Sequence, residues 1–183
     1  MGTFASLMAS IVVSLGLGAP AAPVAAAGAI GAATNSTFAL HVNTLTITVP
    51  ASAGLGNGSQ GNSLSASMGT ITVEDSRNGS MTWTATVTST NFTTGGGSAG
   101  ETIAKGNVAY WSGPTTSQSG GGTRVPGQLT AADKVPLSSP VIAFKGTKAP
   151  LSTTTSWQPK LVISVPIAAI IGHYTGVITH TVT

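Results

Sequence analysis

The sequence predicts an all-β protein, an antiparallel β-sandwich of the Ig-like or Greek-key type, preceded by an N-terminal secretory signal segment. Three observations predict this fold. Between Met81 and Val87, apolar residues alternate with threonines, which is the two-residue period of a half-buried strand. Other short strand-like runs follow along the chain, with turn residues between them. Beyond the signal segment, no window has the 3.6-residue period of a helix.

The N-terminal segment has the composition of a secretory signal. The first 34 residues carry no charge, and an apolar run from Phe4 to Leu17 precedes a small-residue run from Gly18 to Ala33. The run Ala25–Ala27 offers the small-x-small pattern that signal peptidase accepts. We expect a signal peptide at residues 1–27, with cleavage as late as about residue 33. A short N-terminal helix is the alternative, but two glycines and two prolines would interrupt it.

The rest of the chain has the size of one domain. Residues 35–183 are expected to form a single β-sandwich, large enough to bury a core. The 183 residues include no cysteine, so an exported chain of this kind must be stabilised by its core rather than by disulfides. After the signal, no apolar run approaches the roughly 18 residues of a membrane span. We therefore expect a soluble mature protein.

Each expected strand follows from a local pattern. Apolar residues stand at alternate positions in two consecutive runs, first at the even positions Phe38, Leu40 and Val42 and then at the odd positions Leu45, Ile47 and Val49. This change of face predicts a turn or a bulge between the two runs. Pro50 should end the second run. We expect further strands at 70–73, 81–92, 103–111, 141–145, 161–165 and 174–183, and polar surface loops at 51–67 and 112–122.

Groups able to do chemistry are few and scattered. The chain has four acids, Glu74, Asp75, Glu101 and Asp133, and three histidines, His41, His173 and His180. They form no metal-binding motif, so we expect no metal and no cofactor. Adjacent Glu74 and Asp75 would point to opposite faces of a strand, and no Gly-x-Ser-x-Gly motif occurs. We expect no enzyme, although the many serines leave a Ser-His-Asp triad open. Seven isolated Lys and Arg residues argue against nucleic-acid binding.

The densest charge cluster predicts a structural ion pair. Asp75 and Arg77 lie two residues apart, so their side chains share one face of an extended chain. We expect a charge-assisted pair that stabilises the turn at Asn78-Gly79.

Two tryptophans lie next to loops. Trp111 follows Tyr110 and precedes Ser-Gly-Pro, and Trp157 precedes Gln-Pro. Indole rings beside such loops can stack on the apolar faces of sugars. The alternative for both is to cap the core, and a core position is also the alternative for Trp83.

The order of several motifs resembles the WxL domain of Gram-positive surface proteins. The matching segments are Ile71–Arg77, Met81–Ala85, Phe92, Val165-Pro166 and Gly172–His180. This family has an Asp-x-Arg turn, a following Trp-x-Leu strand and a C-terminal Gly-x-Tyr strand with a second Trp. The chain has Ala85 at the family's Leu and His180 at its second Trp, so it resembles a divergent member.

The resemblance implies a secreted, cell-wall-associated module that attaches non-covalently to peptidoglycan or to partner surface proteins. It implies Trp83 and His180 as binding positions, with Asp75, Arg77 and Tyr174 as structural support. Trp111, Trp157 and Tyr110 are the binding candidates that come from the loop pattern. Two alternatives remain: a structural protein whose threonine-rich strand edges pair between copies, and a carbohydrate-binding adhesin.

Overall fold

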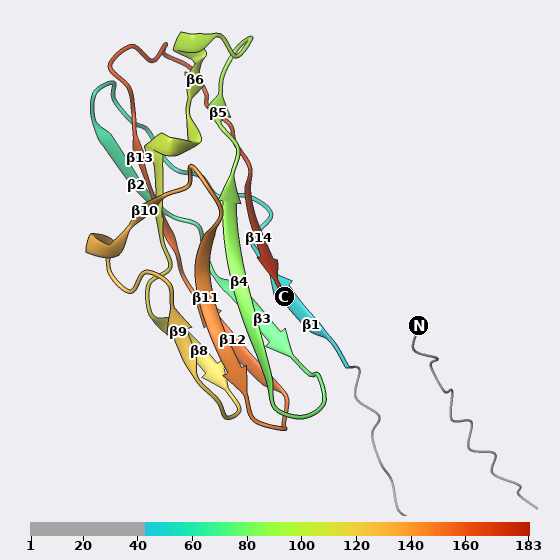
Figure 1. Ribbon diagram of the computed structural model, residues 1–183. Coiled ribbons are helices and arrows are strands. Elements are labelled where there is room, and N and C mark those ends of the chain that lie inside the picture. The colour runs from blue at the N-terminus through green and yellow to red at the C-terminus, as the bar shows by residue number, and fades with distance from the viewer. Residues whose placement is uncertain (1–42) are drawn as a thin grey trace, which may run out of the picture. The chain divides into compact units, whose positions relative to one another are not determined.

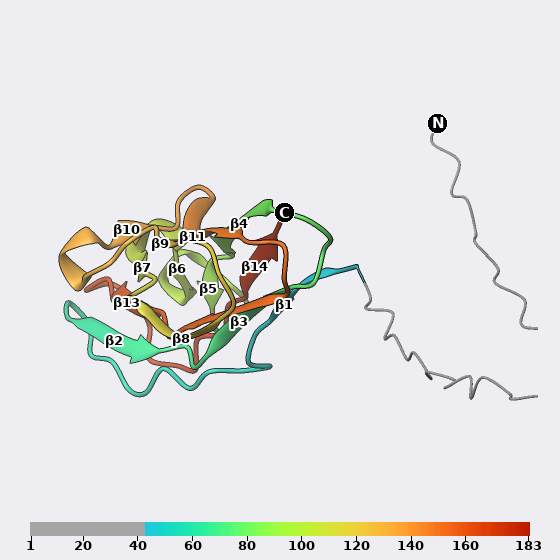
Figure 2. The ribbon, with the colours of Figure 1, turned by 90° about the horizontal axis from the view of Figure 1, so that it is seen from below.

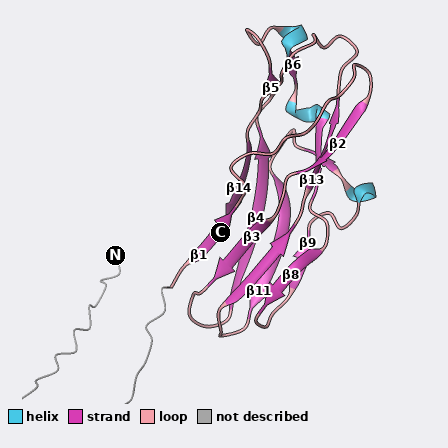
Figure 3. Cartoon of the chain, turned by 180° about the vertical axis from the view of Figure 1, so that it is seen from behind, coloured by secondary structure: helices cyan, strands magenta, loops and turns pink. Residues whose placement is uncertain are grey.

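Antiparallel strands dominate residues 43–183, which are the residues that the computed structural model describes (Figure 1). The predicted all-β class is therefore confirmed, and the arrangement fits a β-sandwich. Three single-turn 3-10 helices are the remaining regular elements of the described part (Figure 3). The predicted signal peptide at 1–27, the domain boundary at 35 and the strand with Phe38, Leu40 and Val42 lie outside the described residues.

One layer of the sandwich is a four-stranded sheet, here named the β4 layer. Its strand order is β14-β4-β11-β9, and every neighbouring pair is antiparallel. The strands are β4 (Met81–Ser89), β9 (Arg124–Pro126), β11 (Val141–Lys148) and β14 (Ile178–Val182). Strand β11 carries a bulge between Ile142 and Phe144.

The second layer consists of two sheets, and we call it the split layer. Its first sheet contains β1 (Leu45–Thr48), β3 (Ile71–Asp75), β12 (Thr153–Trp157) and β8 (Thr115–Ser119), in the order β1-β3-β12-β8. Its second contains β10 (Val135–Pro136), β7 (Val108–Trp111), β13 (Lys160–Ser164) and β2 (Ser63–Ser67), in the order β10-β7-β13-β2. A separate small hairpin is formed by β5 (Phe92–Thr93) and β6 (Thr102–Ile103).

The two sheets of the split layer are joined by three chain segments that pass from one to the other. These connections are residues 68–70, 112–114 and 158–159, between β2 and β3, β7 and β8, and β12 and β13. Pro159 has no N–H for a ladder, and Gly69 and Gly113 have positive φ angles of 82° and 72°. The three connections lie at the same level, because Lys160 pairs with Ser67 and Trp111 on one side of the break and Trp157 pairs with Ile71 and Thr115 on the other. In the view from below, β4 and β11 lie on one side of the molecule and β3 and β8 on the other (Figure 2).

The core lies between the two layers and is richest in aromatic rings near the centre of β4. The ring of Phe144 stacks on Trp157 at 4.8 Å between centroids and on Trp83 at 6.4 Å. Gly146 pairs with Trp83 across the strands, and a Cβ at position 146 would overlap the indole. A glycine is therefore required there for Trp83 to enter the core.

The alternation predicted for β4 is confirmed. Trp83, Ala85 and Val87 are buried, whereas the threonines between them lie on the outer face. Met81 begins the strand beyond the aromatic cluster and is 42 % exposed, so it is not part of the core.

Several sequence-based boundaries were wrong. The expected loops at 51–67 and 112–122 contain β2 and β8, and β12 was not expected at all. Strand β8 has no apolar residue, so its pairing with β12 left no hydrophobic pattern in the sequence. The single strand expected at 103–111 is interrupted by the 3-10 helix Lys105–Asn107. The last strand begins at Ile178 rather than at residue 174.

The aromatic stack makes Trp157 a strong test of this core. Trp157 is 0 % exposed, so Trp157→Ala should lower the free energy of unfolding by about 3–5 kcal/mol. Leu151, which is 77 % exposed, is the control. Leu151→Ala should change the free energy of unfolding by less than about 0.5 kcal/mol. Urea denaturation followed by tryptophan fluorescence measures both, and equal effects would contradict this description of the core.

Candidate functional site

Three of the five candidate binding residues are core residues. Trp83, Tyr110 and Trp157 are buried between the layers. Their rings therefore occupy the core position that was the alternative to ligand binding for Trp83 and Trp157. The loops beside Trp157 and Tyr110 suggested exposure, but both side chains fall on the inner face of their strands. Strand parity, rather than distance from a loop, decided their position.

His180 belongs to a hydrogen-bonded group at the rim of this core. Its Nε2 lies 3.3 Å from the Tyr110 hydroxyl, to which Trp157 Nε1 donates a bond of 3.4 Å. Burial lowers the pKa of His180 to about 4, and burial raises the pKa of Tyr110. Both groups are therefore neutral near pH 7. His180 is half-buried, and its imidazole is directed toward the Tyr110 hydroxyl at the rim of the core.

Trp111 is the candidate that reaches the surface. It is half-buried and lies on the outer face of β7, with its strand partner Lys160 on β13. The Lys160 ammonium lies 5.4 Å from the centroid of the indole, a cation–π contact. The neighbouring outward positions are Ala109, Val162, Ser65 and Ser67. We call these six residues the Trp111 face.

The predicted pair of Asp75 and Arg77 is confirmed. Arg77 Nε and Nη2 donate to the two carboxylate oxygens of Asp75 at 3.0 and 2.8 Å. Arg77 Nη2 also donates to the carbonyl oxygen of Thr82 at 2.8 Å, so the pair connects the end of β3 to the start of β4. Burial of the Asp75 carboxyl opposes ionisation, but hydrogen bonds from Arg77 and its charge outweigh this and lower the pKa of Asp75.

The other polar groups that the sequence singled out also have local partners. The Tyr174 hydroxyl lies 2.8 Å from the carbonyl oxygen of Ile170 and 3.0 Å from that of Gly100, so it joins two loops. Hydrogen bonds from Ser98 lower the pKa of Glu101, and those from Thr130 lower that of Asp133. Each of these acids therefore closes its own 3-10 turn.

These positions assemble no acid–base or metal cluster. Within residues 43–183, no three His, Asp or Glu side chains are close enough to share a metal ion. Over the same residues, no helix is long and apolar enough to cross a lipid bilayer. What the described surface offers is a partly exposed indole beside a cation and hydroxyls, which is chemistry suited to binding.

Sequence reasoning missed two residues that matter to the surface. Lys160 faces Trp111 only because β7 and β13 pair in one particular register. Gln128 is buried although it lies in a polar loop, because Ser112 and Gly113 bind its backbone. Neither contact leaves a local signal in the sequence.

The chain was compared with models of protein families, with curated proteins and with solved structures, and none of them matches it.

The Asp75 carboxylate predicts a specific acid sensitivity. Its pKa is lower in the folded protein than the unfolded value of 3.8, so the pair's contribution is complete above that value and is lost as pH falls through the folded pKa. We expect Asp75→Asn to lower the free energy of unfolding by about 2 kcal/mol near pH 7. The variant should also lose less stability than the unchanged protein below about pH 4.

Thermal unfolding measured between about pH 2 and pH 7 tests this expectation. Glu74→Gln, at the adjacent exposed position, is the matched control and should follow the unchanged protein. If the stability of Asp75→Asn falls at low pH as steeply as that of the unchanged protein, the ion pair is not responsible for the acid sensitivity.

Proposed function

We propose that this protein is a secreted, non-catalytic module that attaches non-covalently to cell-wall glycan through the Trp111 face. The observation that carries the proposal is the partial exposure of the Trp111 indole, whereas Trp83 and Trp157 are buried. The resemblance to WxL domains supports a cell-wall ligand, and the signal-like N-terminal composition supports export. Trp83 and His180 serve the fold in this proposal and do not contact the ligand.

The chemistry of the Trp111 face suits a glycan that carries acidic groups. The apolar face of a sugar ring can stack on the indole of Trp111. The hydroxyls of Ser65 and Ser67 can exchange hydrogen bonds with sugar hydroxyls, and both serines are exposed. Lys160 adds a positive charge for carboxylates such as those of peptidoglycan. The face lies on a paired sheet, so its groups are held in register before a ligand arrives.

Mutation of the indole separates binding from folding. Trp111→Ala should reduce the fraction of protein that sediments with purified peptidoglycan by at least about fivefold, since a stacking side chain contributes about 1 kcal/mol or more. Its melting temperature should fall far less than that of Trp157→Ala, because Trp111 is only half-buried.

Lysine variants supply the matched controls for the same assay. Lys160→Gln should weaken sedimentation, whereas Lys134→Gln, an exposed lysine outside the Trp111 face, should leave it unchanged. Recovery of Trp111→Ala in the pellet at the level of the unchanged protein would overturn the proposal.

A second candidate function is self-assembly, and the outer edge of β14 favours it. Thr183 exchanges both backbone hydrogen bonds with Thr84, so the N–H groups of His180 and Val182 point away from β4 by alternation. No strand among residues 43–183 pairs with that side. Edge strands β9 and β10 contain Pro126 and Pro136, whereas β14, like the edge strands β1, β2 and β8, has no proline. An edge without this protection can pair with a second copy.

Proline at the open edge tests assembly. Val182→Pro removes an outward N–H while leaving the bonds to β4, so it should abolish concentration-dependent association through β14. Analytical ultracentrifugation over a wide concentration range measures this. A monomer at every concentration in the unchanged protein would exclude the assembly function, and association that persists in Val182→Pro would exclude β14.

A further inference from the structure

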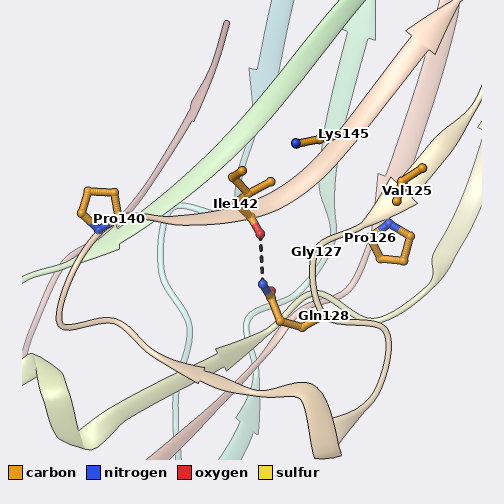
Figure 4. A pocket seen from close by; sticks show the side chains of 7 residues that line it. All are labelled: Val125, Pro126, Gly127, Gln128, Pro140, Ile142 and Lys145. Carbon is orange, nitrogen blue, oxygen red and sulfur yellow. Dashed lines mark hydrogen bonds between the residues drawn. The ribbon is translucent and has the colours of Figure 1, made fainter.

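A concave surface lies in the β4 layer, whereas the Trp111 face belongs to the split layer. It is a shallow pocket of about 460 Å³ formed by β9, the loop that follows it and the start of β11 (Figure 4). The lining residues are Val125, Pro126, Gly127, Gln128, Pro140, Ile142 and Lys145. None of them was a candidate from the sequence.

The backbone of Gln128 is fixed to the opposite layer. Its N–H donates to Ser112 Oγ at 3.1 Å, and its carbonyl oxygen accepts bonds from Ser112 Oγ at 2.9 Å and from the N–H of Gly113 at 3.0 Å. The Gln128 side chain extends from this anchor toward β11, and its Nε2 donates to the carbonyl oxygen of Ile142 at 3.1 Å (Figure 4). The amide is therefore positioned before any ligand binds.

The other half of that amide has no partner. Gln128 is only 6 % exposed, and its Oε1 accepts no hydrogen bond from any described residue. Leaving a buried amide oxygen unpaired destabilises a folded protein, and a methionine of similar volume would avoid that cost. An N–H or O–H donor from a bound molecule would satisfy the Gln128 Oε1 after a small rotation of the side chain.

The walls add an apolar component and a charge. Val125 is 55 % exposed and Ile142 is 40 % exposed, and the two prolines extend this apolar surface. Lys145 faces outward between Thr84 and Val125 in the sheet. Among residues 43–183, no group forms an ion pair or a hydrogen bond with its ammonium. A ligand that carries an anionic group would therefore find an uncompensated cation here.

The chemistry of the pocket distinguishes between ligand classes. None of its seven lining residues is aromatic, so a sugar ring has no platform on which to stack. A phosphate would lack the several donors that usually surround it, since Lys145 is the single cation of the lining. Pro126 removes a backbone donor from β9, so the pocket is suited to side-chain contacts rather than to an added strand.

We propose that this pocket binds the carboxylate end of a peptide whose last residues are small and apolar. In this arrangement the carboxylate pairs with Lys145, an aliphatic side chain packs on Val125 and Ile142, and a peptide N–H donates to Gln128 Oε1. The three groups of such a peptide match an uncompensated cation, an apolar wall and an unpaired acceptor within one pocket. The proposal does not depend on glycan binding by the Trp111 face.

The probe is N-acetyl-valyl-alanine, titrated into the full chain while ¹⁵N–¹H spectra are recorded. We expect saturable shifts of the Gln128 side-chain amide and the Gly127 backbone amide, with a dissociation constant in the millimolar range. The same peptide with an amidated C-terminus should bind roughly fivefold or more weakly, because it cannot pair with Lys145. The absence of shifts at Gln128 and Gly127 up to about 10 mM peptide would overturn the proposal.

Variants identify the groups responsible. Lys145 is exposed, so the Lys145→Gln variant should fold normally. This substitution should remove the preference of the pocket for a free carboxylate over an amidated C-terminus. Lys160→Gln is the matched control and should bind the peptide unchanged, as should Trp111→Ala. Gln128→Met should weaken binding roughly fivefold without loss of the folded spectrum.

If Gln128→Met does not fold, the Lys145→Gln result and the amidated peptide decide the question. A carboxylate preference that persists in Lys145→Gln, or N-acetylglucosamine shifting the same resonances while the peptide does not, would overturn the proposal.

Discussion

The stacking of Phe144 between Trp83 and Trp157 is the contact on which the two layers depend. Trp83 and Phe144 come from the β4 layer, and Trp157 comes from the split layer, so the stack crosses the centre of the sandwich. Gly146 provides the space for the Trp83 indole. Without a disulfide in the chain, this aromatic contact and the apolar residues around it hold the layers together.

The polar part of the fold is stabilised mainly by hydroxyls and backbone bonds rather than by charges. Asp75 and Arg77 form the ion pair that secures the turn between β3 and β4. Glu101 and Asp133 cap 3-10 turns. Threonines cover the outer face of β4, where a branched side chain suits a pleated and half-solvated surface. Among residues 43–183, these assignments leave Glu74 as the acid whose carboxylate has no ion-pair or hydrogen-bond partner, and they leave Lys145 available for surface contacts.

The common break in the split layer connects the fold to its surfaces. Trp111 is the last residue of β7 before the break, and the alternation of β7 places its ring on the outer face beside Lys160. The next two residues, Ser112 and Gly113, have backbone and hydroxyl groups outside the ladder, and these bind Gln128 of the loop after β9. The same interruption therefore positions the Trp111 face on one layer and anchors the pocket of Gln128 on the other.

The fold class and the local pairs could be predicted from the sequence, because both depend on residues that are close along the chain. The alternation in β4 and the spacing of Asp75 and Arg77 are of this kind. Tertiary structure alone decided which tryptophan reaches solvent, because that depends on strand parity and on which sheet covers each face. The formation of strands β2, β8 and β12 also depends on the tertiary structure, because their backbone pairing needs no hydrophobic pattern. The partners of Trp111 and Gln128 come from register across strands, which no local pattern encodes.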